Sequence, residues 1–301
     1  MKILVTGGNG FLGRHLVKYL LKKGHIITIF DNFSNSKNSS TLSFSNDCLK
    51  IINGDITIPQ EIESAIIEQD IVVHLAAKIS VEDSIKNPTE TLRINVDGTK
   101  NILSACHKYK IKKLIAASSA AVYGEGEKNI KLNENSKINP ISPYGESKFQ
   151  MEQEIKKFSS EHDLNFVILR FFNIFGIGQS AEYAGVITKF IEKISLDKSL
   201  EIFGDGIQTR DFVAVQDVVS SIDNAIEYGK NGIYNIASGK SITIKELAEF
   251  MISLSGKNLK IKFLEPKKGD IKYSQADISL AKKELNYSPK FDLNEIKNLL
   301  D

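Results

Sequence analysis

A doubly wound α/β fold built on a parallel sheet is predicted by two features of the sequence. Short β-branched runs alternate with longer amphipathic stretches over the first two-thirds of the chain, and such alternation is typical of βαβ units with parallel strands. A glycine-rich turn follows the first run directly, as in a Rossmann-type strand, turn and helix. The 301 residues are enough for one large domain or two joined domains.

The individual elements follow from the residue pattern. Apolar β-branched runs predict strands at Lys2–Thr6, Ile26–Phe30, Ile51–Asn53, Ile71–Leu75, Lys113–Ser118 and Phe166–Arg170. Amphipathic patterns between them predict helices at Phe11–Lys23, Pro59–Glu68, Pro88–Lys108 and Pro143–Glu161. The segment Phe33–Asp47 is rich in Ser and Asn without periodicity and predicts a surface loop.

The alternation breaks into shorter pieces beyond about residue 175. This change predicts a smaller mixed α/β region on the C-terminal side of the Rossmann-type sheet. We therefore expect one domain at residues 1–175 and the smaller region at 176–301, with chain crossings between the two.

The charge balance and the cysteine content exclude several classes of protein. With Lys+Arg 39 and Asp+Glu 37 the formal net charge is +2, without the concentrated basic excess of a nucleic-acid-binding protein. Cys48 and Cys106 lack a CxxC partner, so we expect neither a metal site nor a disulfide framework. No stretch reaches the roughly 18 apolar residues that span a bilayer, and the apolar start is too short for a signal peptide. We therefore expect a cytoplasmic protein without a membrane or nucleic-acid partner.

The glycine-rich turn predicts a dinucleotide site. Gly7, Gly10 and Gly13 lie between a predicted strand and a predicted helix, where backbone N–H groups can approach a pyrophosphate at the helix N-terminus. Asp31 follows the second strand and is placed to accept hydrogen bonds from an adenosine ribose. A carboxylate there repels the 2′-phosphate of NADP and favours NAD. The alternative is an ordinary βαβ turn with a solvated aspartate, and Asp55 is either an adenine neighbour or a turn residue.

A tyrosine and a lysine four residues apart predict acid–base chemistry. Tyr144 and Lys148 follow Pro143 and project from one helix face, so the ammonium can lower the pKa of the phenol. Two other pairs, Tyr19/Lys23 and Tyr109/Lys113, share this spacing and are interpreted as coincidences. Tyr144/Lys148 differs from them because it follows a strand ending in Ser118 and Ser119, whose carboxyl end faces the ligand crevice of a parallel sheet. Ser119 is either a partner of Tyr144 at a substrate hydroxyl or a strand-end cap.

Motifs in one order cover nearly the whole chain and carry a resemblance to a known family. The sequence resembles the extended short-chain dehydrogenases/reductases, specifically the NAD-dependent sugar-nucleotide epimerase/dehydratase family. The matching segments are Thr6–Gly13, Asp31–Lys37, Gly54–Ile56, His74–Ala77, Asn95–Thr99, Ser118–Gly124, Pro143–Lys148, Arg170–Asn173, Ile202–Gly206, Arg210–Val213, Gly269–Asp270 and Ala276–Asp277.

The resemblance implies NAD as the cofactor, a UDP-hexose as the substrate, and a homodimer formed through the helices around Pro88–Lys108 and Pro143–Glu161. It implies a catalytic set of Ser119, Tyr144 and Lys148. The cofactor contacts it implies are Gly7, Gly10, Phe11, Leu12, Gly13, Asp31, Asn32, Asp55, Ile56, Leu75, Ala76, Ala77, Asn95, Tyr144, Lys148 and Phe171. The substrate contacts are Ser119, Phe172, Asn173, Val186, Phe203, Arg210, Lys267, Asp270 and Ser274.

Two alanines favour epimerisation over elimination. Dehydratases of this family carry Asp-Glu after the catalytic hydroxyl, and this chain has Ala120 and Ala121 there. Alanine transfers no proton, whereas reversible oxidation at C4 through a 4-keto sugar needs only the tyrosine, the serine and the nicotinamide. The resemblance therefore implies a 4-epimerase acting on UDP-glucose and UDP-galactose. The alternatives are another nucleotide-sugar epimerase or dehydratase of the family, or a non-catalytic NAD-binding regulator.

The chain departs from the family pattern at the diphosphate site. Arg is scarce, at four positions; Arg210 and Asn173 match the family's diphosphate contacts, although Arg210 could also form a surface ion pair with Asp211. Lys267 replaces a family arginine and cannot form the bidentate fork. Ser274 stands where some 4-epimerases carry a tyrosine, which leaves room for N-acetylated sugars. A uronate is disfavoured because the segment 173–179 lacks a basic residue, and Lys78 has no assigned role.

Overall fold

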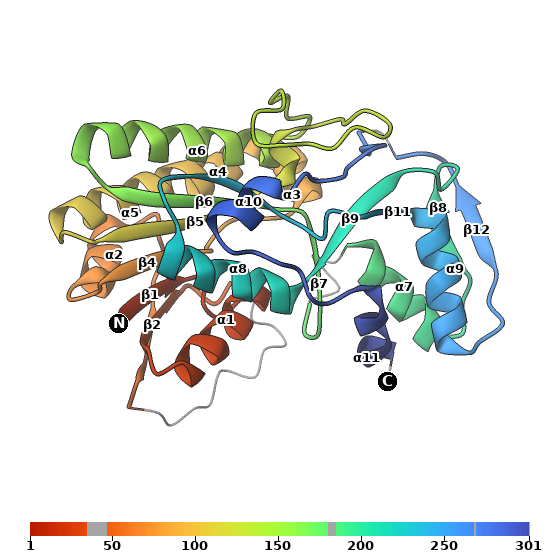
Figure 1. Ribbon diagram of the computed structural model, residues 1–301, viewed down its shortest axis with the longest axis horizontal. Helices are drawn as coiled ribbons and strands as arrows, with labels where there is room; N and C mark the ends of the chain where they lie inside the picture. Colours follow the sequence, from red (N-terminus) through yellow and green to blue (C-terminus); the bar gives the residue numbers. More distant parts are fainter. Residues whose placement is uncertain (35–46, 180–184, 268, 301) are drawn as a thin grey trace.

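A seven-stranded sheet forms the centre of the larger part of the protein (Figure 1). The computed structural model describes residues 1–34, 47–179, 185–267 and 269–300. The strand order is β10-β6-β5-β4-β1-β2-β3, and each neighbouring pair is parallel. The strands are β1 (Lys2–Thr6), β2 (Ile26–Asp31), β3 (Leu49–Asn53), β4 (Ile71–His74), β5 (Lys113–Ser119), β6 (Asn165–Phe171) and β10 (Gly232–Ile236). The order reverses between β1 and β4, so their carboxyl ends border the crevice where ligands bind in such sheets.

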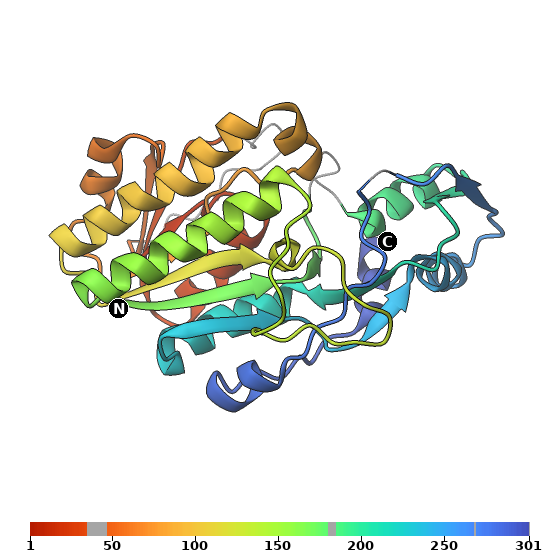
Figure 2. The same ribbon diagram turned by 90° about the horizontal axis from the view of Figure 1, so that it is seen from above.

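Helices cover both faces of this sheet, as a doubly wound fold requires. Helices α1 (Phe11–Lys22) and α8 (Val215–Tyr228) contact each other on one face, and α2 (Pro59–Ile66), α5 (Gly98–Lys108) and α6 (Pro143–His162) pack on the other. Figure 2 shows α5 and α6 side by side across the sheet. Because both faces are covered, the strands are apolar on both sides, as in other parallel sheets.

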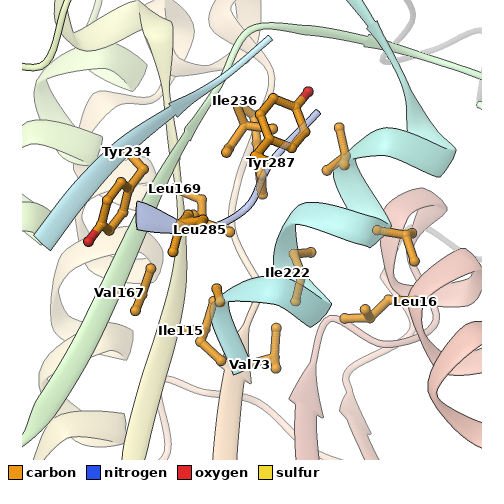
Figure 3. Close-up of a cluster of buried hydrophobic side chains, with 14 of the residues drawn as sticks. Leu16, Val73, Ile115, Val167, Leu169, Ile222, Tyr234, Ile236, Leu285 and Tyr287 are labelled. Carbon is orange, nitrogen blue, oxygen red and sulfur yellow. The ribbon is translucent and has the colours of Figure 1, made fainter. Parts of the chain in front are cut away.

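Strand β1 shows how the alternation of side chains serves both cores. Ile3 and Val5 belong to the core under α1 and α8, whereas Leu4 belongs to the core under α2, α5 and α6. Successive strand residues point to opposite faces, so an all-apolar strand is required. Figure 3 shows the first of these cores, where side chains from β4, β5, β6 and β10, from α1 and α8, and from the segment after α10 (Ser279–Glu284) converge: Leu16, Val73, Ile115, Val167, Leu169, Ile222, Tyr234, Ile236, Leu285 and Tyr287.

A smaller region lies beyond the carboxyl ends of the sheet, on the right of Figure 1. It contains the three-stranded sheet β11-β9-β7 and the parallel pair β12-β8, with a core cluster of its own. Its elements are β7 (Asn173–Phe175), α7 (Val186–Ser195), β8 (Leu200–Phe203), β9 (Thr209–Ala214), β11 (Ser241–Thr243), α9 (Ile244–Ser255), β12 (Ile261–Leu264), η4 (Leu293–Ile296) and α11 (Lys297–Leu300). Helix α10 (Ser279–Glu284) returns to pack against β10.

The predicted helix Pro88–Lys108 is interrupted in the structure. It consists of α4 (Pro88–Leu92), the five-residue π-helical turn η1 (Arg93–Asp97) and α5. Helix α3 (Val81–Lys86) precedes it. Such π-turns are frequent at functional sites, and η1 carries Asn95.

The other sequence predictions have mixed outcomes. The fold class is confirmed, and the predicted strand Lys2–Thr6 coincides with β1. Strand β10 was not predicted, because the pattern beyond residue 175 gave no long alternating unit; it returns the chain to the edge of the main sheet beside β6. The division at residue 175 stays a prediction. Most of the predicted loop Phe33–Asp47, residues 35–46, lies outside the described residues. In the described part of the chain no helix is long and apolar enough to cross a membrane.

Candidate active site

A cavity of about 490 Å³ lies at the carboxyl ends of the central strands. It is bordered by the glycine turn, by the ends of β2, β4, β5 and β6, and by the first turns of α6. Every predicted cofactor residue except Asn95 lines it: Gly7, Gly10, Phe11, Leu12, Gly13, Asp31, Asn32, Asp55, Ile56, Leu75, Ala76, Ala77, Tyr144, Lys148 and Phe171. Of the predicted substrate residues, Ser119 and Phe172 line it.

The glycine turn brings backbone to backbone at distances that no side chain allows. Gly7 has φ +70, and a Cβ on it would lie 2.7 Å from the backbone nitrogen of Ala76. A Cβ on Gly13, in the first turn of α1, would lie 2.3 Å from the carbonyl oxygen of Gly7. The helix therefore starts directly against the turn, and its N-terminal amides face the cavity, an arrangement that favours an anion.

Two carboxylates flank this turn. Asp31 ends β2, and its carboxylate accepts hydrogen bonds from the backbone nitrogens of Asn9 (2.9 Å) and Phe33 (2.8 Å). Each oxygen keeps a lone pair for a further donor. Asp55 follows β3 and accepts from the nitrogen and the hydroxyl of Thr57, both at 2.8 Å, and from Asn32. Burial opposes ionisation of Asp55, but these hydrogen bonds outweigh it and lower its pKa.

The three predicted catalytic side chains meet at the end of β5. Ser119 is the last residue of that strand, and its hydroxyl accepts from the backbone nitrogen of Ala121 at 3.1 Å. Tyr144 lies in the first turn of α6, which Ser142 caps and Pro143 begins, and its phenol is hydrogen-bonded to Ser119. Lys148, one turn later and 4% exposed, donates from Nζ to the carbonyl oxygen of Ala117 at 2.8 Å. The strand end and the helix start thus place a hydroxyl, a phenol and an ammonium on one wall.

The ionisation of these groups is set chiefly by burial. Burial raises the pKa of Tyr144, and its hydrogen bond to Ser119 lowers it in part. Burial lowers the pKa of Lys148 to about 8, against the opposing effect of Glu152. The i,i+4 spacing predicted a Tyr144 pKa lowered by Lys148. The structure shows a raised one, because desolvation of the phenol dominates and the ammonium donates to Ala117. His74, buried beside Lys148, has its pKa lowered to about 3.

Asn95 differs from its predicted role as a cofactor contact. It is buried, accepts from the backbone nitrogen of Lys78 (2.7 Å), and donates to the carbonyl oxygen of Lys78 (3.0 Å) and the hydroxyl of Ser147 (2.9 Å). Its side chain is therefore occupied in joining the segment after β4 to α6. It supports the cavity wall at Lys78, and a direct contact with the cofactor stays a prediction.

The remaining predicted substrate residues lie in the smaller region, outside this cavity's lining. Arg210, on β9, pairs through Nη2 with Asp270 at 2.6 Å. The alternative partner, Asp211, is fully buried and instead accepts from Ser238, Gly239 and Ala276. Asn173 donates to the carbonyl oxygen of Asp211 at 3.1 Å. Burial lowers the pKa of Arg210 and the charge of Asp270 opposes that shift.

Lys267 connects α3 with the end of β8 in the smaller region. Its Nζ lies 3.2 Å from Glu82 of α3 and 4.5 Å from the ring centroid of Phe203 at the end of β8. Val186 begins α7 and packs against the core of the smaller region. Ser274 is buried, and its backbone nitrogen donates to Thr209. These residues stay predicted substrate contacts.

Several lining residues were missed by sequence reasoning. Arg14, in the first helix, donates to the carbonyl oxygens of Asn9 and Gly178 and connects the glycine turn to the segment after β7. Its position one residue after Gly13, together with the scarcity of arginine, was the available signal. Glu90 and Ile94 also line the cavity, but nothing in the sequence marks them, because the π-turn that directs this segment is a tertiary feature.

The parallel sheet, the glycine turn and the grouping of a serine, a tyrosine and a lysine are the features of a short-chain dehydrogenase/reductase. The model of the NAD dependent epimerase/dehydratase family matches residues 3–237. The chain belongs to this family.

Solved structures agree with this assignment. The UDP-glucose 4-epimerase of Thermotoga maritima, solved with UDP-glucose, is 33% identical with a TM-score of 0.93, covering 100% of this chain and 97% of that one. The UDP-N-acetylglucosamine 4-epimerase of Methanobrevibacter ruminantium, in complex with UDP-N-acetylmuramic acid, is 36% identical with a TM-score of 0.93, covering 99% and 96%. The UDP-glucuronic acid 4-epimerase of Bacillus cereus, in complex with UDP-glucuronic acid and NAD, is 32% identical with a TM-score of 0.91, covering 99% and 100%.

NAD is the cofactor of this family, and the cavity fits it. The turn at Gly7 and Gly13 is a cradle that a Cβ would fill. Asp31 holds its carboxylate at the strand end, where we expect it to bind a ribose diol and to repel a 2′-phosphate. The chain is therefore a nucleotide-sugar epimerase-family enzyme that depends on NAD.

Proposed function

We propose that this protein interconverts the C4 epimers of a UDP-hexose, with UDP-glucose and UDP-galactose as its substrates. One observation carries the proposal: Ser119, Tyr144 and Lys148 converge on one cavity wall while the next two residues, Ala120 and Ala121, transfer no protons. This supports oxidation and reduction at a hydroxyl-bearing carbon and disfavours the elimination step of a dehydratase. The 4-epimerases among the similar structures support the same reaction.

The chain's own residues then move one proton and hold the sugar. The glycine turn and Asp31 would hold NAD, which would supply the acceptor for the C4 hydride and the donor that returns it to the other face of the ring. Tyr144, as phenolate, takes the proton of the O4 hydroxyl and gives it back at the end of the cycle. Ser119 donates to the same oxygen and positions it. In this proposal the Lys148 ammonium, one turn further along α6, favours the phenolate once the cofactor and the sugar are bound. Between the two transfers the 4-keto sugar must turn over.

A rotating sugar requires that the nucleotide be held firmly. We assign the diphosphate to Arg210 and Asn173, which lie together on neighbouring strands β9 and β7. In this proposal Asp270 holds the Arg210 guanidinium until the phosphates arrive. Lys267 supplies a further positive charge over Phe203, but a single ammonium does not form a planar two-bond contact.

The reaction is tested by product analysis. Purified protein is incubated with UDP-, dTDP- and GDP-hexoses, and the products are resolved by chromatography with NMR assignment of C4. We expect UDP-glucose and UDP-galactose to be interconverted with no net reduction of NAD. A 4-keto-6-deoxy product would identify a dehydratase, and unchanged sugars with firmly bound NAD would identify a non-catalytic regulator. Either result would overturn the proposal.

N-acetylated hexosamines are a second substrate class that Ser274 favours. The serine is small and buried, so a C2 acetamido group has more room than beside a tyrosine. We expect comparable turnover of UDP-GlcNAc and UDP-glucose. We expect Ser274→Tyr to reduce kcat/KM for UDP-GlcNAc more than tenfold while UDP-glucose changes little, and absent turnover of UDP-GlcNAc by the unmodified protein would contradict this assignment. UDP-glucuronate belongs in the same panel, since a similar structure is an epimerase for it.

The homodimer stays a prediction. Helices α5 and α6 lie side by side on the outside of the sheet (Figure 2), which is the pair through which association is expected. Light scattering at several protein concentrations tests it.

A further inference from the structure

A buried ion pair lies directly behind the catalytic wall, the side of the cavity formed by Ser119, Tyr144 and Lys148. Glu152, on α6, is 0% exposed, and Arg170, on β6, is 3% exposed. The guanidinium donates from Nε to Oε1 at 2.9 Å and from Nη2 to Oε2 at 2.7 Å. The Ser118 hydroxyl donates to Oε1 at 2.6 Å. The proposed reaction uses neither Glu152 nor Arg170, although Arg170 is one of four arginines in the chain.

The far side of Arg170 is also held. Its Nη1 donates to the Tyr123 hydroxyl (2.9 Å) and to the carbonyl oxygen of Glu134 (3.3 Å), and its guanidinium carbon lies 4.8 Å from the Tyr123 ring centroid. Tyr123 in turn donates to Asn235 on β10 at 2.6 Å. Burial disfavours the charge on Arg170, but the hydrogen bonds to Glu152 outweigh it and raise its pKa. The guanidinium is therefore fixed in place and holds Glu152 in turn.

The pair touches the catalytic wall at two points. Ser118 immediately precedes Ser119 and is the register partner of Arg170 across β5 and β6. Glu152 follows Lys148 by four residues on α6, a spacing that places both side chains on one helix face. The titratable groups that interact electrostatically with the Lys148 ammonium are Glu152 on α6 and His74 on β4, which is neutral near pH 7, and the Arg170 guanidinium pairs with Glu152. Glu152 is thus the negative charge beside Lys148.

Stability alone does not account for this arrangement. Burying two charges costs more than packing apolar side chains of the same volume, and such pairs can often be replaced by hydrophobic residues without loss of stability. Apolar side chains of the same helix, Met151 and Ile155, pack in the interior between α6 and the sheet. We therefore look for a role of the Glu152 carboxylate that depends on its charge.

We propose that Glu152 is a positioning residue of the active site: held by Arg170, its carboxylate keeps the Lys148 ammonium charged and fixes the end of β5 that carries Ser119. Arg170 serves by holding Glu152 and does not reach the substrate. The proposal rests on the proposed 4-epimerase function in one respect: that function gives the charge of Lys148 its catalytic role. The charge relation between Glu152 and Lys148 exists whether or not a sugar is turned over.

The first test observes Lys148 directly and needs no turnover. Protein is labelled with lysine carrying 13C at Cε, the Lys148 signal is assigned by its loss in Lys148→Met, and its chemical shift is titrated. In Glu152→Gln we expect the midpoint to move about one pH unit lower, because an opposite charge one helical turn away in a buried environment raises a lysine pKa by this order. Glu152→Asp keeps a carboxylate and is expected to restore most of the shift. An unchanged midpoint in Glu152→Gln overturns the proposal.

A matched control separates charge from packing. Tyr123→Phe removes a partner of Arg170 but leaves the Glu152 carboxylate in place, so we expect stability to fall while the Lys148 midpoint is unchanged. If Glu152→Gln does not fold, Glu152→Gln/Arg170→Met carries the test, because it removes the carboxylate without leaving an unpaired buried guanidinium. A Tyr123→Phe shift as large as that of Glu152→Gln would show that general loosening moves Lys148 and would overturn the proposal.

The second test uses turnover. With UDP-glucose we expect the alkaline limb of the kcat profile of Glu152→Gln to move to lower pH, with a loss of about tenfold at pH 9 and a small loss at pH 7, while the KM is little changed. An equal loss at every pH would indicate a purely structural role and count against the proposal. If the unmodified protein epimerises no sugar, the proposed function fails, but the lysine titration still decides the role of Glu152.

Discussion

Replacing Gly13 with alanine tests the close approach between helix α1 and the glycine turn. A Cβ at this position would lie 2.3 Å from the carbonyl oxygen of Gly7 and 2.7 Å from two backbone atoms of Gly8. Ordinary van der Waals contact begins near 3.4 Å, so the gap is short by about an ångström. All three atoms belong to the backbone, and no side chain can turn away to make room.

The expected cost follows from this geometry. Forcing an extra methyl group into a packed interior costs about 1–3 kcal/mol, and a contact with backbone on three sides belongs at the upper end. About 3 kcal/mol corresponds to a fall in Tm of about 6–12 °C for a chain of this size. Since the first turn of α1 must move away from the glycine turn, the site for the pyrophosphate is distorted, and NAD affinity should fall by more than tenfold.

Urea unfolding and calorimetric titration with NAD measure both effects. Gly185→Ala is the matched control, because Gly185 has φ −65 and a Cβ there meets nothing within 4 Å. We expect the control to unfold within about 0.5 kcal/mol of the unmodified protein and to bind NAD equally well. A Gly13→Ala protein that matches the control in both measurements would refute the reasoning from the close approach.

Three further predictions concern single side chains. Tyr144→Phe should lower kcat by at least about 100-fold while NAD remains bound. Tyr109→Phe is the control: its phenol bonds only weakly to Glu63, so kcat should be unchanged. Turnover retained in Tyr144→Phe would exclude Tyr144 as the base. Arg210→Lys should raise the KM for UDP-glucose by about tenfold with little change in kcat, because an ammonium cannot make the planar two-bond contact with a phosphate. An unchanged KM would show that Arg210 does not bind the diphosphate. The free energy of unfolding should fall as pH drops below 6.5, by up to about 1.4 kcal/mol per pH unit. The unfolded chain protonates His74 in that range, whereas its folded pKa is about 3; the slope should be smaller in His74→Asn, and an equal slope would assign the acid sensitivity to other groups.

Much of the fold could be predicted from the sequence because its signals are local. The apolar run Lys2–Thr6 is strand β1, and Asp31 ends β2 as the glycine-turn motif requires. The spacing of Gly10 and Gly13 reflects contacts with Gly7 and Gly8 within the same turn. Strand β10 was missed because its place in the sheet depends on pairing with β6, more than sixty residues earlier in the chain.

The candidate site divides in the same way. The sequence by itself determined which residue types are present: a glycine cradle, a strand-end carboxylate, a serine, and a tyrosine and lysine one turn apart. It also determined that two alanines stand where elimination would need a proton donor and acceptor.

The tertiary structure decided the environment of each group. Desolvation raises the pKa of Tyr144 and lowers that of Lys148, and spacing along a helix contains no information about burial. Arg210 pairs with Asp270, sixty residues away, instead of with its neighbour Asp211, because adjacent strand residues point to opposite faces. Glu152 and Arg170 meet behind the catalytic wall only because α6 packs across β5 and β6. The sequence therefore determined which functional groups are present, whereas packing decided the protonation tendency and the hydrogen-bond partners of each group.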